Sequence, residues 1–126
     1  MTRHRLWLVA FWLAVLAGIT ASLWPGPQLP DPWFRGADKL QHALAYAMLF
    51  LLGRQAGYRS NWGLPLALLA LGGAIELAQG TFTVTRSAEW LDGLADAVGI
   101  AVGRWLALWA ERQRADSTGL KQVNGR

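Results

Sequence analysis

The apolar residues of this chain are gathered into blocks that are long enough to cross a lipid bilayer. The first block, residues 6–24, carries no charged side chain and matches the roughly 20-residue helix that spans a hydrocarbon layer about 30 Å thick. Charged residues make up only 16% of the chain, against about 25% in ordinary soluble domains, and hydrophobic residues make up 53%. We therefore expect an all-α integral membrane protein.

Four apolar or amphipathic segments predict a four-helix transmembrane domain over residues 1–110. A signal peptide is the alternative for the first segment, but its apolar run exceeds the usual signal core of about 7–15 residues, so we predict a retained helix. Four prolines between residues 24 and 34 remove amide donors and predict an extended loop. The polar tail, residues 111–126, is expected to be a frayed helix end followed by disorder. The predicted helices are about 6–24, 38–57, 62–79 and 89–110.

The distribution of lysine and arginine predicts the orientation. If the N-terminus is cytoplasmic, nine of these cations fall inside and three fall outside, namely Arg35, Lys39 and Arg86. The positive-inside rule then places both termini in the cytoplasm. The net charge of +4 does not indicate a nucleic-acid partner, because the cations form short runs between apolar blocks and not a basic face. No cysteine is present, which excludes a disulfide framework, a thiol nucleophile and a cysteine metal site.

Ionisable and polar residues gather where three of the predicted helices meet the outer face. Residues four apart share a helix face, so Asp38, His42 and Tyr46 form one polar stripe. A second stripe is polar near the start of the last helix and continues with Gly99 and Gly103, small residues that let helices approach closely in lipid. We expect a polar cluster at the outer end of the bundle, formed by Asp38, Lys39, His42, Tyr46, Glu76, Gln79, Arg86, Asp92 and Asp96.

Glu76 is the member of this cluster that is hardest to explain as an ordinary surface residue. An ionisable group inside an apolar span costs about 2.5–3.5 kcal/mol and usually faces a cavity or a partner. Simpler explanations exist for the others: Asp92 as a first-turn acid, His42 as a hydrogen-bond partner of a neighbouring helix, Tyr46 as packing. A divalent cation is an alternative way to balance the acids, with His42, Glu76 and Asp96 as candidate ligands, although no cofactor is predicted.

These residues, in this order, resemble the VanZ-like family of small bacterial membrane proteins. The resemblance rests on Asp38-Lys39-x-x-His42-x-x-x-Tyr46, on Glu76-x-x-Gln79, on Arg86, and on Asp92-x-x-x-Asp96-x-x-Gly99, and it covers about residues 6–109. The family usually has asparagine where this chain has Asp96. The resemblance implies a multi-pass protein of the bacterial cytoplasmic membrane with a cell-envelope role, in a family named for low-level resistance to glycopeptides such as teicoplanin.

Three functions and one structural role remain open at this stage. The first is a binding or envelope-modifying protein whose outward cavity holds part of a lipid-linked or peptidoglycan-related molecule, with Lys39 and Arg86 pairing to anionic groups. The second is an enzyme that uses a metal or acid/base chemistry on a membrane substrate. The third is an ion- or proton-coupled transporter. Alternatively, the cluster only fastens the helix ends together. The expected partners are the lipid bilayer and a lipid-linked or peptidoglycan-related ligand, without nucleic acid, and the oligomeric state stays open.

Overall fold

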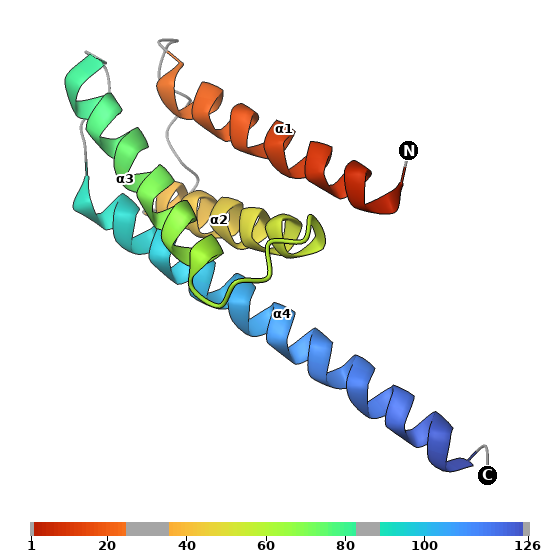
Figure 1. Cartoon of the computed structure of the whole chain (residues 1–126). Helices are drawn as coiled ribbons and strands as arrows, with labels where there is room; N and C mark the ends of the chain where they lie inside the picture. Colours follow the sequence, from red (N-terminus) through yellow and green to blue (C-terminus); the bar gives the residue numbers. More distant parts are fainter. Residues whose placement is uncertain (1, 25–35, 83–88, 125–126) are drawn as a thin grey trace.

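The computed structural model describes residues 2–24, 36–82 and 89–124, which form four α-helices and no strand (Figure 1). This confirms the all-α prediction. The helices are α1 (Arg3–Leu23), α2 (Ala37–Gln55), α3 (Gly63–Phe82) and α4 (Trp90–Asn124). The proline-rich stretch and Arg86, both singled out in the sequence, lie outside the described residues.

Within the described residues, three helices, α1, α3 and α4, are long and apolar enough to cross a membrane. Large apolar side chains on their surfaces are exposed, as is usual for helices that face lipid: Leu13 is 60% exposed and Leu77 is 73% exposed. The helices thus support the prediction of a membrane protein. The fourth predicted span, α2, is not among them, because Asp38, Lys39 and Arg54 interrupt its apolar sequence.

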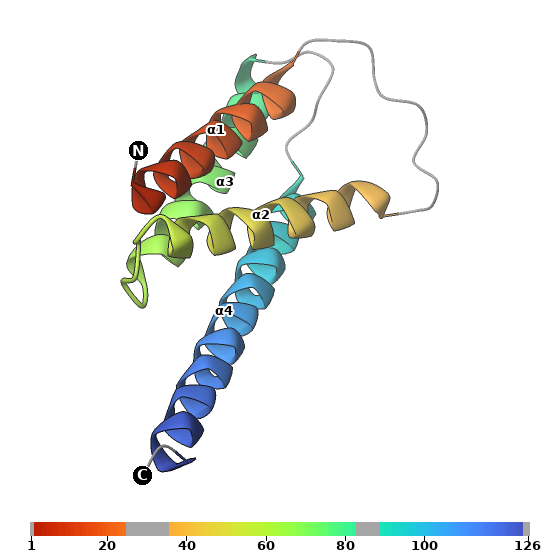
Figure 2. The same cartoon turned by 90° about the vertical axis from the view of Figure 1, so that its right-hand side faces the viewer.

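The most extensive helix contact joins α2 to α4, and two glycines make it possible. A methyl group at Gly99 would overlap the backbone of Ala43, and one at Gly103 would lie 2.8 Å from the carbonyl oxygen of Ala47. The predicted small-residue stripe therefore faces the interior and brings the two backbones together. Figure 2 shows that α2 crosses α4 and does not run alongside it.

The other helices pack around this crossing. Both α2 and α3 contact all three remaining helices, whereas α1 and α4 share no close contact in the described part of the chain. The core between them is built from Phe11 and Val15 of α1, Leu49 and Phe50 of α2, and Leu68 of α3. The first turns of α2, the last turns of α3 and the first turns of α4 converge beside this core, which positions the site described below.

The predicted helix boundaries need three corrections, one of which is that α1 begins at Arg3 and not near residue 6. The largest concerns the tail: α4 continues through Asn124, so residues 111–124 are helical where we expected fraying and disorder. Glu, Arg, Gln and Ala dominate residues 110–115 and are strong helix formers, and Arg54 of α2 pairs with Glu111, which ties the first tail turn to the bundle. In addition, α3 ends at Phe82 and not near residue 79.

By contrast, the end of α2 lies close to its predicted position because glycine terminates it. Gly57 has φ +96°, and the amide of Tyr58 donates to the carbonyl oxygen of Gly53, the pattern of a left-handed helix C-cap.

Candidate functional site

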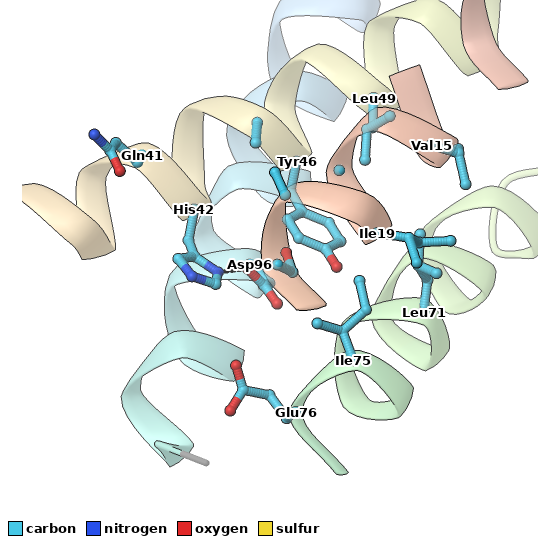
Figure 3. Close-up of a pocket in the computed structure, with 14 residues that line it drawn as sticks. Val15, Ile19, Gln41, His42, Tyr46, Leu49, Leu71, Ile75, Glu76 and Asp96 are labelled. Carbon is cyan, nitrogen blue, oxygen red and sulfur yellow. Dashed lines mark hydrogen bonds and ion pairs between the residues drawn. The ribbon is translucent and has the colours of Figure 1, made fainter. Parts of the chain in front are cut away.

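The structure brings most of the predicted polar residues together at one end of the molecule. Asp38, Lys39 and His42 come from the first turns of α2, Glu76 from the end of α3, and Asp92 and Asp96 from the start of α4. They meet because the first turns of α2 lie beside the first turns of α4, just before the closest approach of the two helices at Ala43 and Gly99. Figure 3 shows His42, Tyr46, Glu76 and Asp96 around one cavity. Arg86, the remaining predicted cation, lies outside the described residues.

A histidine–aspartate pair forms the buried part of the cluster. His42 Nδ1 lies 2.9 Å from Asp96 Oδ1, and its other ring nitrogen, Nε2, lies 3.9 Å from Asp92 Oδ2. Asp96 is only 2% exposed, which is rare for a carboxylate without a partner. The imidazole is therefore the group that compensates the burial of Asp96, and the two residues hold α2 and α4 together through this pair.

A lysine forms the centre of the more exposed part. Lys39 Nζ lies 2.7 Å from Asp38 Oδ2, 2.6 Å from Glu89 Oε2 and 2.5 Å from Asp92 Oδ1. One ammonium thus contacts three carboxylates, one from α2 and two from the start of α4 and the residue before it. Pairing of Lys39 with an anionic ligand stays a prediction, and such a ligand would compete with these three acids for the ammonium.

Glu89 is a site residue that the sequence analysis missed. It immediately precedes α4, one turn before Asp92, and its carboxylate accepts from Lys39 while its backbone N–H donates to Glu76 Oε2 at 3.0 Å. The available signal was its position: an acid at a helix start, three residues before another acid of the cluster. Glu89 thereby joins α4 to the last turns of α3.

One carboxylate oxygen of Glu76 accepts a hydrogen bond, and the other has no donor among the described residues. Its Oε2 accepts the Glu89 amide, whereas its Oε1 is inaccessible to solvent and has no hydrogen-bond partner among the described residues. A buried acceptor without a donor costs about 1–3 kcal/mol. This oxygen is therefore the atom of the cluster most in need of a donor from outside the chain.

Tyr46 and Gln79 are the two remaining predicted site residues that the structure describes, and both are buried. Tyr46 is 6% exposed, and Gly72 of α3 makes room for it: a methyl group there would lie 3.1 Å from the Tyr46 hydroxyl and 2.5 Å from Asp96 Oδ2. Gln79, 3% exposed, donates from Nε2 to the carbonyl oxygen of Ser22 at 2.9 Å. Tyr46 thus packs against the ionisable groups, and Gln79 ties α3 to α1.

A cavity of about 250 Å³ lies between α1, α2 and α3, and it is apolar except at one end. Most of its walls are apolar, including Val15, Ile19, Leu49, Leu71 and Ile75. At its polar end the cavity is lined by His42, Glu76 and Asp96 (Figure 3). An apolar chamber closed by ionisable groups is the arrangement expected for a molecule with an apolar part and a polar part.

The acids that approach one another most closely differ from the predicted metal ligands. Among the described residues, the set of three whose oxygens lie within 4.8 Å of one another is Asp38, Glu89 and Asp92. The Lys39 ammonium already contacts all three of these carboxylates, so a cation occupies the position that a metal ion would take. The set His42, Glu76 and Asp96 does not gather this closely, and a metal there stays a prediction.

Comparisons of the chain with protein-family models, with curated proteins and with solved structures found no match. The geometry of the site therefore carries the functional argument.

Proposed function

We propose that this chain is a VanZ-like integral membrane protein whose polar-ended cavity holds part of an amphiphilic cell-envelope molecule. The observation that carries the proposal is the cavity of about 250 Å³, apolar along most of its walls and closed by His42, Glu76 and Asp96. In this proposal all four helices lie in the cytoplasmic membrane, both termini are cytoplasmic, and the cluster faces outward. The charge distribution and the resemblance of the motifs support that orientation.

The chemistry of the polar end favours a particular kind of head group. Five carboxylates (Asp38, Glu76, Glu89, Asp92 and Asp96) are gathered around one ammonium and one imidazole, so hydrogen-bond acceptors exceed donors there. The uncommitted Glu76 Oε1 points to the same preference. A head group rich in hydroxyl, amide N–H or amine groups fits these acceptors, whereas a phosphate would be repelled. The sugar and peptide parts of peptidoglycan-related molecules carry such hydroxyl, amide and amine groups.

The test is to fill the apolar part of the cavity and follow bound lipid. Leu71→Trp places a large ring in the cavity wall, and we expect it to remove co-purified amphiphile seen by native mass spectrometry. Leu77→Trp is the matched control, because Leu77 lies on the same helix, is 73% exposed and does not line the cavity. If both variants retained the same bound molecules as the wild type, the cavity would not be the binding site and the proposal would fail.

One observation favours a second candidate, an enzyme that acts on such a molecule. His42 is held by a buried carboxylate, Asp96, at the end of a cavity, which is how a histidine is oriented for general-base chemistry. Under this alternative the wild type converts the retained amphiphile during incubation, whereas His42→Ala retains it unchanged. An equal lack of conversion in both proteins would leave binding as the function.

A further inference from the structure

A second groove lies at the end of the molecule opposite the polar cluster. It has a volume of about 300 Å³ and runs between the end of α2, the connector that follows it and the middle of α4. Its polar lining consists of Arg54, Gln55, Arg59, Glu111 and Arg114, and its apolar lining includes Leu51 and Leu106. The groove is therefore basic on one side and apolar on the other.

Only one of its three guanidinium groups is neutralised. Arg54 Nη2 lies 2.5 Å from Glu111 Oε1, and Arg54 Nη1 donates to the carbonyl oxygen of Arg59 at 3.0 Å. The side chains of Arg59 and Arg114 are exposed and make no hydrogen bond, ion pair or ring contact within the described residues. The groove consequently carries two cationic groups in excess, both with free donors.

A neighbouring cation of α4 that does not line the groove is already engaged. Arg104 lies on the adjacent face of α4, but its guanidinium stacks over the Trp62 ring at 4.7 Å and is already engaged. Arg54 is rigidly held by its two partners, which fixes one guanidinium plane at the groove wall. A fixed guanidinium beside two free ones is suited to an anion with several oxygens, because guanidinium forks match phosphate geometry.

The position of the groove along the helices indicates which class of molecule carries that anion. Leu51 and Leu106 continue the lining toward the apolar middle of the helices, and Arg114 belongs to the polar turns of α4 beyond it. A basic pocket at the boundary between apolar and polar helix surface attracts anionic lipid head groups. We infer that this groove binds the phosphate of an anionic phospholipid, whose acyl chain lies along Leu51 and Leu106. This inference does not depend on the function proposed for the cavity.

The test compares lipid binding of two charge-matched double variants of the full chain. Arg59→Gln with Arg114→Gln removes the free cations of the groove, and we expect phosphatidylglycerol to bind about tenfold more weakly. Because these side chains have no partner among the described residues, the variant should unfold at the wild-type temperature. Arg5→Gln with Arg112→Gln removes the same charge outside the groove, since neither residue lines it, and should bind as the wild type does.

The measurement is titration of each detergent-purified protein with dioleoyl phosphatidylglycerol, followed by native mass spectrometry. Phosphatidylcholine with the same acyl chains is expected to bind weakly to all three proteins, since its head group has no net charge. Equal loss of phosphatidylglycerol in both double variants would overturn the proposal in favour of nonspecific attraction. Full displacement of the lipid by millimolar glycerol 3-phosphate would also overturn it, because the site would then recognise a soluble phosphate and not a lipid.

Discussion

Replacement of Gly99 by alanine tests the close approach on which the whole site depends. The added methyl group would overlap the carbonyl oxygen and Cα of Ala43 in α2. Those are backbone atoms, which cannot rotate away as a side chain would, so α2 and α4 must separate. Ala43 is the neighbour of His42, and the same displacement would lengthen the contact of His42 with Asp96, now 2.9 Å.

The magnitude follows from two opposing contributions. An alanine in a helix interior is favoured over glycine by up to about 1 kcal/mol. Overpacking a closely fitted contact costs about 1–3 kcal/mol, and the upper end applies here because the obstacle is backbone. We therefore expect Gly99→Ala to lower the free energy of unfolding by about 2 kcal/mol.

A control on the same helix isolates the contact. Gly93 also lies in α4, but nothing is found within 4 Å of a methyl group added there, so Gly93→Ala should be neutral or stabilise by up to about 1 kcal/mol. The assay is unfolding of both variants in mixed micelles, with helix content followed by circular dichroism. If Gly99→Ala were as stable as Gly93→Ala, the reasoning about the α2–α4 contact would be refuted.

Two further predictions concern the ends of the bundle. Replacing Lys39 with methionine leaves three carboxylates without their shared cation and should lower the free energy of unfolding by about 1–2 kcal/mol, between the values for exposed and buried ion pairs. Adding Asp92→Asn should recover part of this loss in a double-mutant cycle, and strictly additive effects would contradict the shared ion pair. Residues 111–118 should show helical ¹³Cα chemical shifts in detergent, whereas random-coil shifts would restore the disordered tail expected from composition.

The parts of the fold that follow local rules could be predicted from the sequence. Uninterrupted apolar length located α1, and the three- and four-residue spacing of Asp92, Asp96, Gly99 and Gly103 placed the acids and glycines of α4 on one inward stripe. The alternating directions of the helices also predicted that acids from three helices would meet at one end, and spacing then predicted which of them share a face. These successes share a cause, because helix periodicity fixes which side chains lie on the same face.

The remaining features depend on how separate helices are placed. The contact of Lys39 with three acids requires the α2–α4 crossing, and Lys39 therefore looked like a cation available for a ligand. Glu89 sits outside the apolar periodicity, and its only signal was its position at a helix start, three residues before Asp92. The polar composition of residues 111–124 predicts disorder, but this segment is helical in the structure. Its first residues favour helix, and Glu111 pairs with Arg54 of α2.

The ion pairs of Lys39 also have a consequence for the conditions under which this end of the protein keeps its shape. Many acidic clusters at membrane surfaces are held together by Mg²⁺ or Ca²⁺ from the surroundings, and they loosen when those ions become scarce. Here the bridging charge is covalently attached to α2, so its local concentration does not vary with the medium. These contacts of Lys39 therefore join α2 to α4 without a divalent ion, and chelators should leave them intact.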